Sequence, residues 1–141
     1  MKKLFFFLGI ICNSCIIEYD TSTEFIYENK TDYTISMEMI MPRLHDTIFI
    51  DTYNIDSLSE KSISCNGSGL NVLYNFLYLY DSVVFSIGDS VSKTFLKDDI
   101  SEYNPLNLDN YILSKKSGKR YDYFKYTYTF TNDNISKILG Q

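Results

Sequence analysis

The sequence has very few of the residues from which most catalytic and metal sites are built. Its 141 residues include a single histidine, His45, and no tryptophan. With no second histidine, a zinc site built from several histidines cannot be filled in the usual way. A long hydrophobic run is also missing. The apolar stretch from Leu4 to Ile11 is far below the ~20 residues that a helix needs to span a bilayer.

The N-terminal stretch has the layout of a cleavable export signal. Two lysines precede the apolar stretch, and small polar residues then lead to Cys15. The end of this stretch resembles a bacterial lipoprotein signal, in which a small residue, here Ser14, precedes the cysteine that becomes acylated and N-terminal. The resemblance implies lipidation of Cys15. The alternative is an ordinary secretory signal with incidental cysteines.

This interpretation divides the chain into a lipoprotein signal peptide, an acylated tether and one folded domain. The three parts are residues 1–14, residues 15–23 and residues 24–141. Each buried acyl CH₂ contributes roughly 0.8 kcal/mol, so the two or three chains of a bacterial lipoprotein would hold the protein firmly. We therefore expect a cell-envelope protein anchored to the outer membrane. Both the periplasmic face and the outer face of that membrane are compatible with the sequence.

Cysteine is too scarce to supply a disulfide framework. Cys12 would leave with the signal and Cys15 would be acylated, which leaves Cys65 without a partner. The stability of the exported domain must then come from its core. Only Lys61 places a basic group near Cys65 in the sequence, so we favour a structural cysteine over a reactive thiol.

Positive charge is scarce as well. The formal net charge is −5, and loss of Lys2 and Lys3 with the signal would leave −7. An acidic domain repels phosphate backbones, so we expect no nucleic-acid partner. Such a domain also gains nothing electrostatically from anionic headgroups. Membrane attachment is therefore expected through lipid on Cys15.

The remaining composition favours strands. All 13 tyrosines follow Cys15, and Tyr, Ile, Thr and Phe prefer half-buried, pleated surroundings. The alternation of apolar and polar residues is clearest over 34–41, 83–87 and 121–131, as expected for strands with one solvent-exposed face. Gly88-Asp89 predicts a two-residue hairpin turn. Weaker strands are predicted over 25–27, 47–55, 57–64, 91–96 and 111–113.

Other segments read as loops or short helices. Residues 70–80 suit a short helix or a buried strand, and we favour a loop that enters with a short helical turn. Lys125 lies on the wet face of the last strand, which suits an edge or one-sided strand. A short helix is expected over 132–139, ending at Gly140. Turn formers predict turns or loops at 29–32, 66–69, 97–108 and 115–120.

Together these segments predict an all-β fold, an antiparallel immunoglobulin-like β-sandwich of about seven strands preceded by an N-terminal signal helix. A small barrel is the alternative. The missing Cys–Trp–Cys core excludes an antibody-type domain, but not the wider sandwich class.

The order of features is similar to that of small lipoproteins of unknown function from Gram-negative anaerobes of the gut. The shared features are the signal and cysteine, a Phe-x-Tyr-Glu-Asn-Lys-Thr opening at Phe25, an Asp-Ser-Val-Val-Phe segment at Asp81 and a closing Tyr-x-Tyr-Thr-Phe-Thr strand at Tyr126. The resemblance covers most of the chain. It implies an envelope lipoprotein with a β-sandwich domain and transfers no catalytic residue.

Several small groups of residues are candidate sites, and each has a simpler explanation. His45-Asp46 beside Arg43 suits a solvated loop after Pro42. The acids Asp98, Asp99 and Glu102 could bind calcium, but no Asp-x-Asp-x-Asp-Gly loop supports such a site. The methionines over 37–41 could bind a soft metal, although strand alternation explains them as core. The basic segment Lys115, Lys116, Lys119 and Arg120 could contact phosphate or a sulfated glycan, and a solvated turn is the simpler explanation.

Two kinds of modification pattern occur. Asn29-Lys30-Thr31 and Asn66-Gly67-Ser68 match the N-glycosylation acceptor, but bacteria normally lack that enzyme system, so both are interpreted as turns. Asp followed by Ser or Thr and an apolar residue resembles the O-glycosylation acceptor of exported proteins of such anaerobes. It gives four candidates: Thr47, Ser57, Ser82 and Ser90.

We therefore predict a non-catalytic, lipid-anchored cell-envelope protein whose sandwich binds a protein or a glycan, without a metal or cofactor. Tyrosines supply rigid, amphipathic contact surface of the kind that interfaces use. The alternative is a structural subunit of a surface fibre or envelope assembly. A hydrolase would need a pocket with convergent carboxylates or with His45 at its base.

Overall fold

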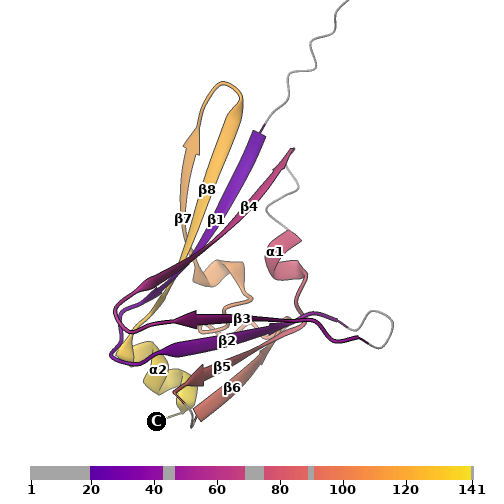
Figure 1. The fold of residues 1–141 in the computed structure, drawn as a ribbon. Helices are drawn as coiled ribbons and strands as arrows, with labels where there is room; N and C mark the ends of the chain where they lie inside the picture. Colours follow the sequence, from indigo (N-terminus) through magenta and orange to yellow (C-terminus); the bar gives the residue numbers. More distant parts are fainter. Residues whose placement is uncertain (1–19, 43–46, 69–74, 89–90, 141) are drawn as a thin grey trace, which may run out of the picture.

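The computed structural model describes residues 20–42, 47–68, 75–88 and 91–140. In these residues two four-stranded sheets pack against each other (Figure 1). We call them sheet A, with the order β4-β1-β8-β7, and sheet B, with the order β3-β2-β5-β6. The prediction of an all-β sandwich is confirmed, with eight strands in place of about seven.

Sheet A joins the two ends of the domain. The first strand pairs with the last in parallel, from Asp20 opposite Tyr121 to Asn29 opposite Phe130. The two outer pairs, β1 with β4 and β7 with β8, are antiparallel. The strands are β1 (Asp20–Asn29), β4 (Glu60–Ser68), β7 (Ile112–Ser117) and β8 (Tyr121–Phe130).

Sheet B is antiparallel throughout. The β5–β6 hairpin turns at Gly88, whose φ of 53° is the left-handed conformation that glycine adopts without steric cost. This agrees with the turn predicted from Gly88-Asp89. The strands are β2 (Ile35–Ile40), β3 (Ile50–Ile55), β5 (Ser82–Ile87) and β6 (Val91–Leu96).

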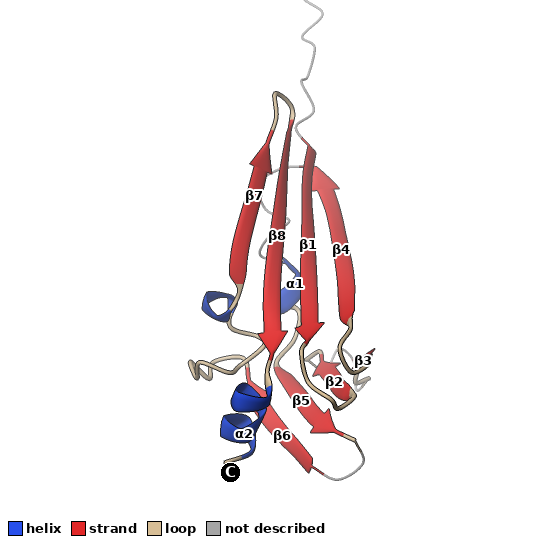
Figure 2. Ribbon diagram, turned by 90° about the vertical axis from the view of Figure 1, so that its left-hand side faces the viewer, coloured by secondary structure: helices blue, strands red, loops and turns tan. Residues whose placement is uncertain are grey.

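Sheet A is longer than the part of it that sheet B covers. In Figures 1 and 2 the strands of sheet B run across one end of sheet A, and the other end projects beyond them. This projecting end, called the tip below, contains the start of β1, the end of β4 and the β7–β8 turn. Helix α1 (Asn75–Tyr78) lies beside sheet A and helix α2 (Asn132–Leu139) lies near sheet B.

The core lies between the inner faces of the two sheets. Met37 and Met39 of β2 are fully buried there, so these methionines are core residues as predicted. Phe85 of β5 stacks on Phe130 of β8, with ring centroids 5.4 Å apart. Burying aromatic rings of this size contributes a large share of the hydrophobic stabilisation of a small sandwich.

Buried tyrosines also contribute to the core, and their hydroxyl groups form hydrogen bonds there. The Tyr111 hydroxyl donates to the Pro105 carbonyl at 2.5 Å and lies 3.1 Å from the Tyr27 hydroxyl. The Tyr128 hydroxyl donates to the Tyr103 carbonyl at 2.8 Å. These bonds tie the long loop after β6 to the inner face of sheet A, because buried polar groups are costly without partners.

The alternation of the strongest predicted strands is confirmed. Ile35 and Val83 are fully buried on the inner face of sheet B, and Phe124, Tyr128 and Phe130 are buried on that of sheet A. Residues 70–80, for which a helix, a strand and a loop were all considered, contain a helical turn at α1. Residues 70–74 lie outside the described part of the chain. The C-terminal helix ends at Gly140 as predicted, with φ of 71°.

Three local predictions were wrong. Residues 20–23, which were assigned to the tether, belong to β1, where Thr21 and Thr23 pair within sheet A and are buried. Residues 66–68 continue β4 opposite β1, although Asn-Gly-Ser is typical of a turn. Lys115 and Lys116 belong to β7, so the turn is confined to 118–120. Of the two alternatives for the last strand, the one-sided strand is confirmed, because β8 lies between β1 and β7 and is not an edge.

Asn29 joins the end of β1 to the β3–β4 connection. Its side chain is 1% exposed, and its amide nitrogen lies 2.7 to 3.1 Å from the carbonyl oxygens of Tyr33, Ile55 and Asp56. Its amide oxygen accepts hydrogen bonds from the backbone and hydroxyl groups of Thr31. One side chain therefore satisfies backbone groups from two separate connections.

We expect Asn29→Ala to lower the free energy of unfolding by about 3 kcal/mol, because it leaves several buried polar groups without partners. Asn54→Ala, at an exposed position of β3, serves as the matched control and should change stability by less than ~0.5 kcal/mol. Urea unfolding followed by circular dichroism measures both. Equal stability of the two variants would contradict the role assigned to Asn29.

Candidate functional site

A groove of about 700 Å³ lies at the tip of sheet A. Its size falls in the range of ~300–1,000 Å³ that is typical of ligand pockets. Residues from all four strands of sheet A line it, mainly on the face turned away from sheet B. They are Asp20, Thr21 and Ser22 of β1, Asn66 of β4, Lys116 of β7, and Tyr121, Asp122 and Tyr123 of β8.

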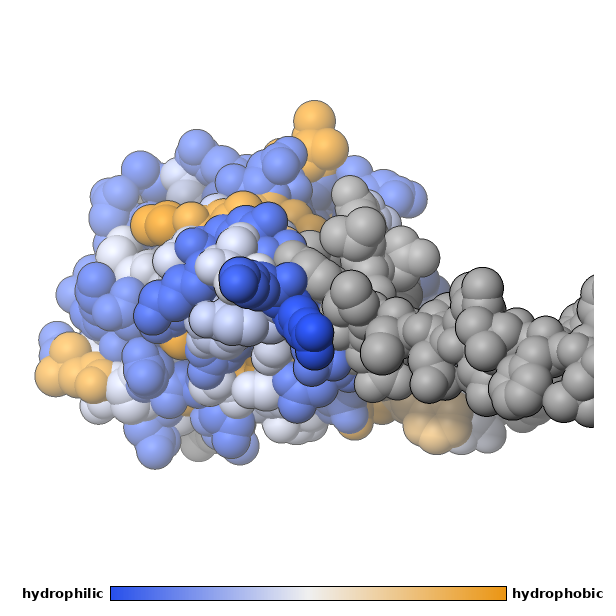
Figure 3. All heavy atoms as spheres, turned by 90° about the horizontal axis from the view of Figure 1, so that it is seen from above, coloured by the Kyte–Doolittle hydropathy of each residue, from blue (hydrophilic) through white to orange (hydrophobic). Residues whose placement is uncertain are grey.

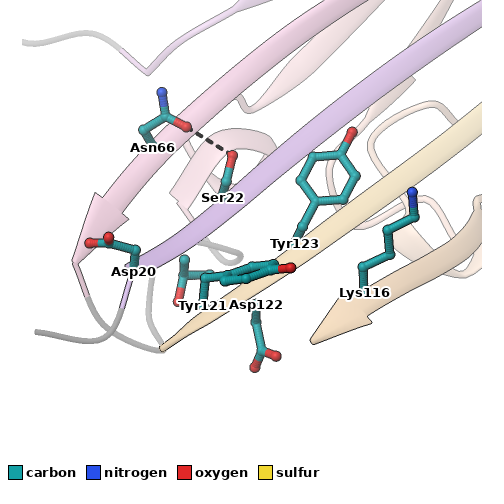
Figure 4. A pocket seen from close by; sticks show the side chains of 8 residues that line it. Asp20, Ser22, Asn66, Lys116, Tyr121, Asp122 and Tyr123 are labelled. Atoms are coloured by element: carbon teal, nitrogen blue, oxygen red, sulfur yellow. Dashed lines mark hydrogen bonds between the residues drawn. The ribbon is translucent and has the colours of Figure 1, made fainter. Parts of the chain in front are cut away.

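Strand alternation decides which side chains face the groove. Tyr121 and Tyr123 are two residues apart on β8, so they share the outer face, whereas Asp122 points the other way (Figure 4). Lys116 pairs with Tyr123 across β7 and β8 and shares that face. The groove therefore combines two aromatic rings with a nearby ammonium group.

The ring of Tyr121 is positioned by Gly118. The Gly118 amide donates to the Tyr121 carbonyl at 2.8 Å and closes the β7–β8 turn. A Cβ atom at position 118 would lie 2.3 Å from Cε1 of the Tyr121 ring, so only glycine leaves room for the ring. Tyr121 remains 53% exposed. Its ring is therefore both oriented and available for contact.

Polar groups from β1 and β4 form the opposite wall. Ser22 and Asn66 are paired in register, and the Ser22 hydroxyl donates to Oδ1 of Asn66 at 2.9 Å (Figure 4). The backbone amide of Asp20 donates to the Arg120 carbonyl at 3.0 Å. This bond joins the first described residue to the β7–β8 turn and closes the end of the groove.

Glu24 extends the polar wall along β1. Its carboxylate accepts hydrogen bonds from the hydroxyl groups of Ser62, at 2.5 Å, and Tyr123. The Ser62 bond, the Tyr123 bond and the nearby charge of Lys125 together lower the pKa of Glu24 below its ordinary value. Tyr123 thus contributes its ring to the groove while its hydroxyl holds a carboxylate.

The basic residues near the tip are divided between the two faces of sheet A. The Lys115 ammonium group lies 3.3 Å from a carboxylate oxygen of Asp122, which is buried, and 4.8 Å from the ring centre of Phe124. Lys116 lies on the outer face beside the groove, and Lys119 and Arg120 are exposed in the turn. The predicted basic turn is therefore partly structural.

The structure places two of the O-glycosylation candidates at exposed positions. Thr47 is exposed before β3, and Ser57 is exposed between β3 and β4. Ser82 is half-buried at the start of β5, while Ser90 lies outside the described residues. Cys15, the lipidation candidate, also lies outside them, so these assignments remain predictions.

The other candidate groups do not form a site in the described part of the chain. Arg43, His45 and Asp46 lie outside it. Asp98, Asp99 and Glu102 line a second hollow of about 640 Å³ with Asp109, but no group of three or more His, Cys, Asp or Glu side chains there could hold a metal ion. The Asp99 carboxylate instead accepts the Ser101 amide at 2.9 Å.

Cys65 and the two asparagine motifs have structural roles. Cys65 is partly buried beside the core, and burial raises the pKa of its thiol, which disfavours the reactive thiolate. Asn29 is almost fully buried and hydrogen-bonded, so its amide cannot act as a glycosylation acceptor in the folded chain. Asn66 lies in β4, bonded to Ser22.

The groove was not predicted from the sequence. Ser22 was assigned to the tether and Asn66 to a turn, while Tyr121 and Tyr123 were recognised only as strand residues. The available signal was the alternation of Tyr121, Tyr123 and Lys125 on the wet face of the last strand, because exposed aromatic residues on a sheet often mark contact surfaces.

Comparison of this chain with protein-family models, with curated proteins and with solved structures finds no match. Among the described residues, no helix has the length and apolar character needed to cross a membrane.

We expect Ser62→Ala and Tyr123→Phe each to raise the pKa of Glu24 towards its ordinary value near 4.5, because each removes a hydrogen bond to the carboxylate. Carbon-detected NMR titration of the Glu24 carboxyl measures this, with Tyr33→Phe as a control away from the site. The lowered pKa contributes stability above pH 4.5 that is lost as the pH falls through the folded value, so the wild type should lose more stability on acidification than either variant. A Glu24 pKa unchanged in both variants would contradict this network.

Proposed function

We propose that this chain is a non-catalytic, lipid-anchored protein of the cell envelope, and that the groove at the tip of sheet A binds a protein or glycan ligand. The lipid is carried by Cys15, after loss of residues 1–14, and attaches the protein to the outer membrane. The proposal extends the resemblance to small envelope lipoproteins and assigns the chain no catalytic residue.

The groove is the single observation that carries the binding role. It offers an oriented aromatic ring at Tyr121, a second ring at Tyr123, and hydrogen-bonding groups on Ser22 and Asn66. Rigid aromatic contacts with a few placed polar groups are the usual composition of binding hot spots. Both charge signs are represented, through Asp20 and Lys116, which suits a polar ligand over a purely apolar one.

The alternative, a structural subunit of a fibre, would use a free strand edge. Strand β7 is at the edge of sheet A, and all of its residues are exposed, including Ile112 and Leu113. Its second half carries Lys115 and Lys116, and lysines on an edge strand oppose pairing with another chain. This edge is therefore poorly suited to pairing with another chain, which counts against assembly through β7.

The anchor is tested by intact mass and lipid analysis of the protein purified from envelopes, with Cys15→Ala as the comparison. We expect the wild type to lack Met1 to Ser14 and to carry a diacylglyceryl group on Cys15, and the variant to leave the membrane fraction because it has no acylation site. An unlipidated, soluble wild-type chain would overturn the anchored assignment.

The groove is tested by placing a photo-reactive phenylalanine at position 121 in cells and by screening the purified protein on an array of envelope glycans. Tyr33 is the matched control, because it is 56% exposed and lies outside the groove. We expect cross-links or array signals that depend on position 121, with at least a tenfold loss of affinity in Tyr121→Ala, about 1.4 kcal/mol, and none in Tyr33→Ala.

Gly118→Ala provides an independent test of the same groove. The added methyl group must displace the Tyr121 ring, so it should weaken ligand binding about as much as Tyr121→Ala while the fold is retained. Far-UV circular dichroism verifies the fold. Full affinity in both variants would show that the ligand binds elsewhere.

A further inference from the structure

The charge of this acidic chain is unevenly distributed. After loss of the signal, the chain would carry 11 basic and 18 acidic residues, and four of the basic ones fall within residues 115–120. The other parts of the chain then hold seven basic residues against the same 18 acids. The net charge of −7 is therefore an average over a basic segment at residues 115–120 and a strongly acidic remainder.

The fold brings this basic segment to the point where the chain enters the domain. The parallel pairing places Asp20 opposite Tyr121, and the Asp20 amide is bonded to the Arg120 carbonyl. Figure 1 shows the start of β1 beside the β7–β8 turn, at the end far from sheet B. Seen end-on, strongly hydrophilic side chains gather at this tip (Figure 3).

The distance from the acylation site to the tip is short. Asp20 follows Cys15 by five residues, which span at most about 18 Å when fully extended. An acylated Cys15 would therefore hold the basic turn close to the headgroups. A tether of this length allows the basic turn to come within a Debye length of ~10 Å of the surface, where the attraction of Lys and Arg to anionic lipid is effective.

We propose that the tip docks on an anionic lipid surface through Lys116, Lys119 and Arg120, with sheet B held away from the membrane. The inference rests on the proposed acylation of Cys15 for its place in the cell. Lys115 is left out because it is paired with Asp122. Repulsion of the remaining acidic domain by the same surface favours the same orientation.

Acidic residues at the same end weaken the attraction without cancelling it. Asp20 is exposed at the tip, and Glu18 precedes it in the sequence. Together they offset two of the three positive charges assigned to the contact. The tip therefore orients an anchored protein and does not by itself recruit a free one, which is why the test uses a tethered chain.

The test attaches the chain from Cys15 to Gln141 to vesicles through a maleimide lipid on the Cys15 thiol, with Cys65→Ala to leave one thiol. All described core residues lie within this chain. Coupling replaces natural acylation, so the result does not depend on it, and the mass analysis of Cys15 tests that step separately. The probes are pure phosphatidylcholine vesicles and vesicles with about one third phosphatidylglycerol.

The readout is the rate at which single lysines react with an amine-acetylating reagent, followed by mass spectrometry. We expect Lys116 and Lys119 to react about fivefold more slowly on the anionic vesicles, the factor that corresponds to one basic residue at an anionic surface. Lys61 and Lys93 are the internal controls. They are exposed on β4 and β6, away from the tip, and should react equally on both vesicles.

Two further conditions make the outcome decisive. Salt at about 0.5 M should abolish the protection, because it shortens the Debye length to a few ångströms. Replacing Arg120 by Gln should reduce the protection of Lys116 and Lys119, whereas Lys30→Gln should not. Equal reactivity of Lys116 and Lys119 on both vesicles would overturn the proposal. So would equal protection of Lys61 and Lys93, since the domain would then lie on its side.

Discussion

The parallel pairing of the first and last strands is the constraint on which the rest of this structure depends. It runs from Asp20 opposite Tyr121 to Asn29 opposite Phe130, so both strands start at the tip and end beside sheet B. The chain entry, the β7–β8 turn and the outer-face tyrosines are thereby brought together at one end. An antiparallel pairing of these strands would have placed the basic turn and the chain entry at opposite ends.

The same pairing separates the core from the groove along a single sheet. At the end covered by sheet B, the inner faces of β1 and β8 supply Phe25, Tyr27, Tyr128 and Phe130 to the core. At the tip, the outer face instead carries the groove, with Ser22 and Asn66 on one side and the rings of Tyr121 and Tyr123 on the other. A strand can serve both purposes because successive side chains alternate faces while the backbone pairing continues unchanged.

Local patterns predicted most of the fold from the sequence. Alternation identified β2, β5 and β8, because each has one buried face, and Gly88 identified a turn that requires a positive φ. Residues 66–68 were assigned wrongly because Asn-Gly-Ser is a turn motif by local preference, yet here it pairs with β1 across the edge of sheet A. That pairing depends on residues far apart in the chain, which no local rule detects.

The site was less predictable for the same physical reason. Each groove residue is ordinary in its own segment, and only the order β4-β1-β8-β7 brings Asn66, Ser22, Tyr123 and Lys116 side by side. The net charge was a poor guide to local electrostatics for a related reason. The value of −5 describes the whole chain, whereas a surface responds to the charges that face it, and the fold leaves Lys116, Lys119 and Arg120 exposed at the same end as Asp20. A strand order that places β1 beside β8 therefore determines which charges this protein presents at the tip.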